Sequence, residues 1–244
     1  MADMASAEGA AAAAAAERKD DDEVVEDLHT PIGLPADIHM YMRSKTVLLE
    51  ILEIRGFDVS PLVTESPEEL KHMAQDDIAK YYMTVKAIDK DSDRVCRVIL
   101  SKTAQSAMKT VESHLNPEHP DALIPENSEI ICLVFGALSD TAIRDIKRKS
   151  KSLHIQIDPI HVSNLLFNVL KHDLVPEYTP VLIGSDEEAD IIESLSIRSK
   201  KQLPVILSVD IISRLLGLRR EQLVLVKNRG PGGSTQYIRV CLDR

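Results

Sequence analysis

Apolar residues in the first part of the chain follow first a helical and then a strand spacing. The helical spacing over 37–55 predicts a helix that ends at Gly56. Residues 81–88 alternate in polarity, and 94–100 form the return strand of a predicted hairpin. Thr103 is then a suitable N-cap for another helix.

The middle of the chain continues this alternation of strands and helices. Residues 129–135 are apolar after the first position, which predicts a strand buried on both faces. Ser139 is a suitable N-cap for a helix with a basic end, and 153–157 predict another strand.

Asp158 and Pro159 supply an N-cap and a first-turn proline, so we expect a helix from here through Val169. The alternation of strands and helices predicts an α/β domain with a three-layer arrangement over 31–171.

The pattern changes after residue 171. Short strands and short helices follow, and they predict a small mixed-β domain over 172–244, so the fold class as a whole is α/β to α+β. The expected elements are a helix over 185–195, a strand over 205–207, a helix ending at Gly217, and strands over 223–227 and 236–242.

Charge and composition exclude several protein classes. The formal net charge is −10, but residues 1–30 hold nine acidic and two basic residues, so the rest of the chain is nearly neutral. We interpret 1–30 as a disordered, alanine-rich and acidic tail. The balance excludes a globally basic nucleic-acid coat, although a local basic patch remains open.

The cysteines and the apolar runs indicate an intracellular protein. Cys96, Cys132 and Cys241 are far apart and form no C-x-x-C motif, which argues against a disulfide scaffold and a zinc ribbon. No apolar run reaches 18 residues and no signal peptide is convincing, so no membrane association is expected.

No sequence motif supports catalysis. The histidines are scattered, and phosphate-binding, dinucleotide-binding and nucleophile-elbow motifs are absent, so we expect no metal, no cofactor and no small-molecule ligand. Asp58, Glu69 and Lys71 have the residue types of a nuclease site, but Glu69 also suits the first turn of a capped helix.

Basic residues cluster at the end of the helix that begins at Ser139. Two explanations stay open: cations stabilise a helix C-terminus, and they also bind phosphates in a salt-sensitive way. The cluster consists of Arg144, Lys147, Arg148, Lys149 and Lys151.

The C-terminal region resembles the fifth subunit of eukaryotic nuclear RNA polymerases, which polymerases I, II and III share. The segment 172–178 resembles the family's H-x-L-V-P-x-H signature, and 202–204 matches its Q-L-P. Residues 210–217 match its D-P-V-A-R-Y-x-G run, and 222–226 followed by Tyr237 match its final hairpin. The same domain of the family is similar to a small subunit of archaeal RNA polymerases.

The N-terminal region resembles this family more weakly. Ser44–Leu48 and Arg55–Phe57 resemble its first helix and R-G-Y ending, and 135–142 lie at its T-P-S-A helix start. The resemblance implies that 31–171 form a jaw lobe near downstream DNA. It also implies that 172–244 form an assembly lobe on the largest polymerase subunit.

Departures from the family pattern suggest a diverged paralogue. Val205 replaces an Arg of the family, Ile211 a Pro and Glu221 a Gly. Tyr178 stands at the last His of the signature, and Asp140 replaces a Pro where DNA phosphate would approach. Because some single-celled eukaryotes carry duplicated copies of this subunit, one assigned to polymerase I, we expect dedication to one polymerase.

The resemblance therefore implies a non-catalytic structural subunit of a nuclear RNA polymerase, located in the nucleus, or in the nucleolus if polymerase I is the host. Its expected partners are the largest subunit, neighbouring small subunits and, weakly, downstream double-stranded DNA. The expected DNA-proximal residues are Ser139, Thr141, Arg144, Lys147, Arg148 and Lys151. The expected assembly residues are His172, Leu174, Val175, Pro176, Gln202, Leu203, Pro204, Asp210, Arg214, Gly217 and Tyr237. A free-standing adaptor of the same fold and a nuclease are the alternatives.

Overall fold

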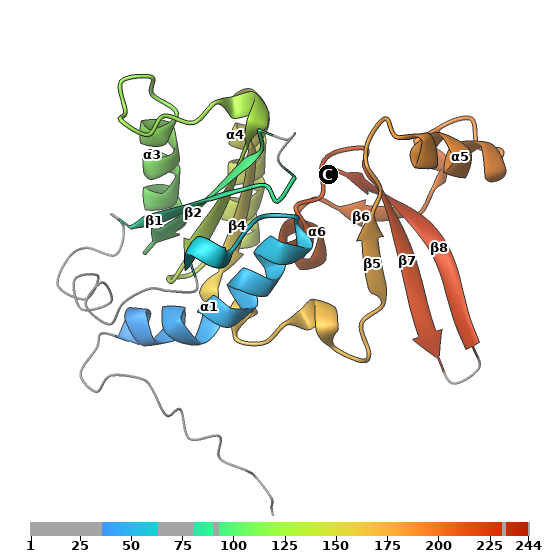
Figure 1. Ribbon diagram of the computed structural model, residues 1–244, viewed down its shortest axis with the longest axis horizontal. Helices are drawn as coiled ribbons and strands as arrows, with labels where there is room; N and C mark the ends of the chain where they lie inside the picture. The colour runs from blue at the N-terminus through green and yellow to red at the C-terminus, as the bar shows by residue number, and fades with distance from the viewer. Residues whose placement is uncertain (1–35, 63–80, 90–92, 231–232, 244) are drawn as a thin grey trace, which may run out of the picture. The chain divides into compact units, whose positions relative to one another are not determined.

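The first sheet combines a hairpin with two parallel crossovers (Figure 1). Strands β1 and β2 are antiparallel, while β2–β3 and β3–β4 are parallel. In this computed structural model the described residues are 36–62, 81–89, 93–230 and 233–243. The strands are β1 (Tyr82–Lys86), β2 (Val95–Ser101), β3 (Ser128–Val134) and β4 (Gln156–His161), in that spatial order.

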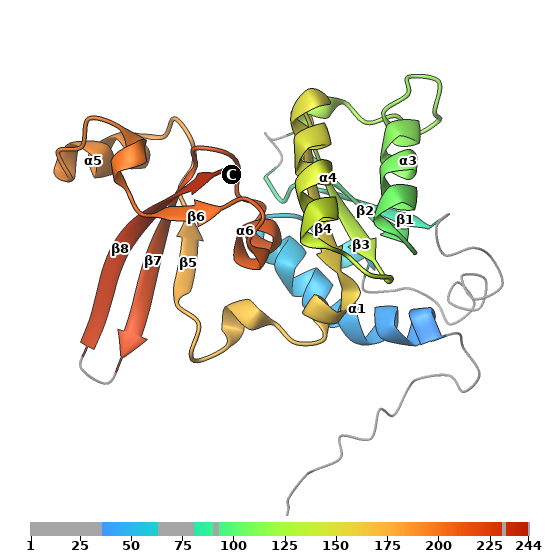
Figure 2. The same cartoon turned by 180° about the vertical axis from the view of Figure 1, so that it is seen from behind.

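Helices cover both faces of this sheet. Helices α3 (Ala104–His114) and α4 (Asp140–Ser152) lie on the face seen in Figure 2, and α1 (Ala36–Ile54) lies on the opposite face. Strand β3 explains how the layers are held, because its residues are buried on both sides. Ile131 and Leu133 pack in the core with α1, whereas Ile130 and Cys132 pack with α3 and α4. The predicted three-layer α/β arrangement is confirmed.

Capping residues begin these helices where the sequence predicts. Thr103 accepts a hydrogen bond from the Ser106 backbone N–H, and Ser106 Oγ accepts one from the Thr103 N–H. Ser139 caps α4 by accepting from the Ala142 N–H at 3.2 Å. Gly56 follows α1 with a φ of 84°, a value that favours glycine.

The expected helix from Asp158 through Val169 is wrong. Both Asp158 and Pro159 lie inside β4, and 3₁₀ turns follow, η4 (Val162–Leu165) and η5 (Val169–Lys171). Strand β4 is an edge strand paired with β3, so Pro159 can lie on the side that needs no ladder N–H. Asp158 is fully buried among cations instead of capping a helix.

The second sheet is mixed, as predicted for the C-terminal region. Its order is β5-β7-β8-β6, with β6 parallel to β8 and the other pairs antiparallel. The strands are β5 (Glu177–Pro180), β6 (Val205–Leu207), β7 (Leu223–Gly230) and β8 (Gly233–Leu242). The associated helices are α5 (Asp186–Ser194) and α6 (Ile211–Leu216), and the remaining 3₁₀ turns are η1 (Ser60–Leu62), η3 (Pro125–Asn127) and η6 (Lys200–Gln202).

Helix α6 contributes to the cores of both sheets. Leu216 packs with the second sheet, while Leu215 packs in the same core as α1 and β3. Residues 33–244 form one compact unit, so contacts between Cα atoms do not divide the chain between 171 and 172, and that boundary stays a prediction. The tail 1–30 lies outside the described residues, so its character stays a prediction as well.

Arg55 ties α1 to α6 and to the first sheet. Its side chain is 1% exposed, and its guanidinium lies 3.1 Å from Asp158 Oδ2 and 3.4 Å from Glu129 Oε2. Its Nε donates to the carbonyl oxygen of Leu215 at 2.9 Å, and its Nη2 donates to that of Arg214. One buried cation thus joins the end of α1, strands β3 and β4, and helix α6.

Charge pairing keeps this buried group ionised. Burial opposes ionisation of Asp158, but Lys147 and Arg55 outweigh that effect and lower the pKa of its carboxyl. Burial likewise opposes the charge on Arg55, yet Asp158 and Glu129 raise the pKa of its guanidinium overall. A buried ion pair of this kind is costly to break on one side.

We predict that Arg55→Met lowers the free energy of unfolding by about 3–5 kcal/mol, because Glu129 and Asp158 lose a buried partner. Urea unfolding measures this change. Arg43→Met on the exposed face of α1 is the matched control and should change stability by less than about 0.5 kcal/mol. Equal losses in the two variants would contradict the role given to Arg55.

Candidate functional site

The start of α4 presents polar side chains to solvent. Ser139, Asp140 and Thr141 are all exposed, and Ser139 already caps the helix. Asp140 lies in the first turn, where its carboxylate interacts favourably with the helix dipole. The same negative charge would repel a phosphate. This end of the helix is therefore less suited to an anion than the basic end.

The structure divides the basic residues of α4 into two groups. Lys147 turns toward the core and lies 2.5 Å from buried Asp158, because it shares a face with Ile143 and Ile146. Arg144 and Arg148 are exposed, and Arg148 makes only a 3.3 Å pair with Asp145. Exposed ion pairs of this kind contribute little to stability, so Arg148 could leave Asp145 and bind another anion.

The two remaining lysines of the cluster make exposed ion pairs with other elements. Lys149 lies 3.0 Å from Glu112 of α3, and Lys151 lies 2.6 Å from Asp243 after β8. The five basic residues thus form no single free patch, and only two of the predicted DNA-proximal cations, Arg144 and Arg148, are exposed without a pair to another described element.

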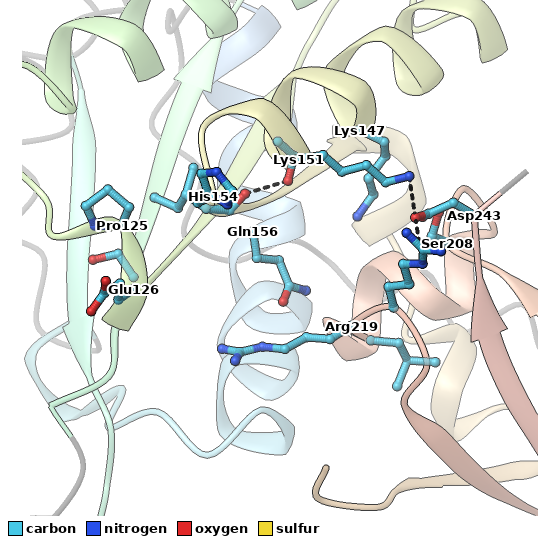
Figure 3. Close-up of a pocket in the computed structure, with 14 residues that line it drawn as sticks. Pro125, Glu126, Lys147, Lys151, His154, Gln156, Ser208, Arg219 and Asp243 are labelled. Carbon is cyan, nitrogen blue, oxygen red and sulfur yellow. Dashed lines mark hydrogen bonds and ion pairs between the residues drawn. The ribbon is translucent and has the colours of Figure 1, made fainter. Parts of the chain in front are cut away.

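A cleft of about 450 Å³ lies beside the end of α4 (Figure 3). Lys147, Lys151 and His154 reach it from α4 and the turn after it, and Arg219 and Arg220 reach it from the segment after α6. Glu126 and Asp243 add carboxylates, so the lining mixes both signs of charge. Within the lining, Asp243 pairs with Lys151 and Arg220, while Lys147 and Arg219 pair with acids outside it.

Several predicted assembly residues are exposed. Leu174 is 86% exposed and Tyr237 is 37% exposed, where the ring of Tyr237 stacks under Arg239. Gln202 and Pro204 are also exposed. A single exposed leucine is common on protein surfaces, so Leu174 marks an interface only if a partner covers it.

Other predicted assembly residues make contacts within the chain itself. Arg214 is 6% exposed and donates to the carbonyl oxygens of Val209 and Pro159. Gly217 has a φ of 65°, and a Cβ there would lie 2.9 Å from Arg55 Nη1. Asp210 caps α6 by accepting from the Ile212 N–H, and Leu203 packs in the core of the second sheet.

The segment around the predicted signature is a tight turn. His172 Nδ1 accepts from the Leu174 N–H at 3.2 Å, and the Val175 N–H donates to the His172 carbonyl at 2.9 Å. Val175 and Pro176 are half-buried. The turn leaves Leu174 as the most exposed of the large apolar side chains that the structure describes.

Sequence reasoning did not identify Glu129 and Asp158 as site residues. Both are acids next to strand positions occupied by isoleucine, Ile130 and Ile157, and this contrast is the signal that could have found them. Arg55 was noted only as part of a motif, because its partners lie 74 or more residues away in the sequence.

Two features of the described residues bear on other functions. These residues hold no group of three or more His, Cys, Asp or Glu side chains that could bind a metal ion. None of the helices that the structure describes is long and apolar enough to cross a membrane. Glu69 and Lys71 of the nuclease alternative lie outside the described residues, and Asp58 accepts hydrogen bonds from Ser60.

Comparisons with known proteins point to one class. Residues 167–241 match the family model described as RNA polymerase Rpb5, C-terminal domain. The chain is 24% identical over 202 residues to DNA-directed RNA polymerase V subunit 5A of Arabidopsis thaliana, covering 79% of this chain and 83% of that protein.

A second relative agrees with the first. The chain is 24% identical over 196 residues to DNA-directed RNA polymerases IV and V subunit 5B of the same plant, covering 78% of this chain and 84% of that protein. The predicted resemblance to the fifth subunit of eukaryotic nuclear RNA polymerases is therefore confirmed.

We predict that Gly217→Ala destabilises the chain more than Gly184→Ala does. Both glycines have positive φ values, 65° and 77°, so both variants adopt a strained backbone, at roughly 1–2 kcal/mol. Only at Gly217 would the new methyl group press on the Arg55 guanidinium, whereas nothing lies within 4 Å at Gly184. Thermal melts that show equal destabilisation would contradict this contact.

Proposed function

We propose that this chain is a non-catalytic subunit of a nuclear DNA-directed RNA polymerase. The observation that carries the proposal is the family match over 167–241, together with two relatives whose names describe polymerase subunits. A structural role agrees with the exposed apolar side chains of the described residues, among them Leu174.

The C-terminal region is the proposed attachment to the largest subunit and its small neighbours. Exposed Leu174, Gln202, Pro204 and Tyr237 would face the partner. Buried Arg214 and half-buried Gly217 would support the region through contacts within the chain. An obligate interface buries apolar groups, and Leu174 offers one that the chain itself leaves uncovered.

The basic end of α4 is the proposed approach to downstream duplex DNA. Arg144 and Arg148 would make weak, sequence-independent phosphate contacts, with Ser139, Thr141 and Lys151 at the margin. Lys147 forms an ion pair with Asp158, so it would hold α4 in place and would not contact DNA.

The host polymerase is a finer proposal. We propose dedication to one polymerase, with polymerase I as the first candidate, and hence a nuclear and nucleolar location. The names of the two relatives assign them to polymerases IV and V, so specialised copies of this subunit have precedent.

Affinity purification of the tagged chain at moderate salt, followed by mass spectrometry, tests this proposal. We predict recovery of the two largest subunits of one polymerase, and that Leu174→Ser reduces this recovery severalfold by removing an apolar anchor. Ile124→Ser is the control, since Ile124 is 67% exposed on a loop of the N-terminal region. Recovery of no polymerase subunit with folded protein would favour a free-standing adaptor, and recovery of all three polymerases would rule out dedication.

We predict that Arg144→Glu with Arg148→Glu weakens DNA binding of the purified polymerase without ejecting the subunit. The slope of log binding constant against log salt should fall by about 1 for each phosphate that the variant no longer binds. Arg43→Glu with Lys109→Glu matches the change in charge on exposed positions of α1 and α3. An unchanged slope in the α4 variant would mean that these cations serve only the helix terminus.

A further inference from the structure

A second cleft, of about 350 Å³, opens beside the buried Arg55. Three guanidinium groups line it, and all three converge on the carboxylate of Glu129. Arg94 Nη2 lies 2.7 Å from Glu129 Oε1, Arg219 Nη2 lies 3.4 Å from the same oxygen, and Arg55 Nη1 lies 3.4 Å from Oε2. We call this site the arginine cleft.

Positive charge exceeds negative charge around the arginine cleft. The second carboxylate nearby, Asp158, is shared between Arg55 and Lys147. Four cations therefore meet two carboxylates, and the buried Nε atom of Arg94 has no hydrogen-bond partner among the described residues. An additional anion would relieve this excess, because guanidinium groups bind carboxylates through paired, charge-assisted hydrogen bonds.

Exposed apolar side chains border the same cleft. Leu182 is 71% exposed, Ile183 is 51% exposed and Ile54 is 46% exposed, and all three line the cleft. They come from two separate elements, since Ile54 ends α1 while the other two follow β5. A ligand with an apolar group on each side of its anion could therefore contact both.

One buried side chain fixes the apolar border relative to a cation. Gln222 Nε2 donates to the carbonyl oxygen of Val181, and Gln222 Oε1 accepts from the Arg219 N–H, at 3.0 and 2.9 Å. These contacts hold the backbone at Val181, next to Leu182, and the backbone at Arg219 in fixed positions before any ligand arrives. Such preorganisation reduces the entropic cost of binding.

We propose that the arginine cleft binds an acidic side chain of a partner protein, within a segment that has apolar residues before and after the acid. The carboxylate would lie between Arg94 and Arg219, and the flanking residues would cover Ile54, Leu182 and Ile183. A chain-terminal carboxylate has a neighbour on one side only, so it would leave one border uncovered. The inference goes beyond polymerase membership, which assigns no ligand to this cleft.

A peptide titration of the full-length chain tests the cleft. The probe is acetyl-Ser-Leu-Glu-Leu-Ser-amide, and the readout is the arginine Nε–Hε signals in ¹H–¹⁵N NMR spectra. We expect saturable shifts of the Arg94 and Arg219 signals, and about tenfold weaker binding of the peptide with Gln in place of Glu. Equal binding of the two peptides, or no saturable shift at millimolar peptide, would overturn the proposal.

Paired variants test the location. Arg219→Gln should weaken binding of the probe about tenfold, whereas Arg220→Gln, whose exposed cation lies outside the cleft, should change it less than twofold. Leu182→Ser should weaken it several-fold and Leu195→Ser, 44% exposed elsewhere, should not. Equal effects within either pair would overturn the location. Tighter binding of a Gln peptide with a free C-terminal carboxylate would overturn the side-chain assignment.

Discussion

The buried guanidinium of Arg55 constrains the structure more than any other described group. It is removed from water, so two carboxylates and two backbone carbonyls must stand in fixed positions around it. Those partners belong to β3, β4 and α6, while Arg55 itself directly follows the last residue of α1. The positions of these elements relative to one another therefore follow from the hydrogen-bonding geometry of a single planar cation.

Ionic groups at such a position contribute specificity as much as stability. An apolar replacement of the whole network could be equally stable, but it would not dictate which carbonyl meets which nitrogen. The network also redistributes charge at the surface. It draws Lys147 inward from the basic end of α4 and gathers Arg94 and Arg219 over Glu129. A count of charged residues in the sequence therefore overestimates the positive charge exposed at the end of α4 and overlooks the arginine cleft.

The sequence predicts the elements whose causes are local. The continuous apolar run of β3, the Thr103 and Ser139 caps, and the end of α6 at Gly217 all depend on neighbouring residues, and all are confirmed. Asp158 and Pro159 show where local reasoning fails. The same pair suits a helix start and an edge strand, and the choice depends on Arg55, about 100 residues away, which no local pattern contains.

The candidate sites divide in the same way. Exposure of Leu174 and Arg148 agrees with a surface role that sequence could suggest, but the inward position of Arg214 depends on its hydrogen bonds to Val209 and Pro159. Pro159 belongs to the first sheet, so the contact joins two distant parts of the sequence. Only the folded chain shows that this arginine is buried.

This distinction bears on the departures from the family pattern. Arg214 and Gly217 keep the residues of the family that the sequence resembles, and Arg214 is buried while Gly217 is half-buried. Val205, Asp140 and Glu221 differ from it and are exposed, whereas Tyr178 and Ile211 differ from it and are half-buried. Glu221 even keeps a positive φ of 62° where the family has glycine, so the backbone conformation outlasted the residue that favours it. Leu174 and Tyr237 also keep the residues of the resembled family and are exposed, so kept residues lie on the surface as well as inside.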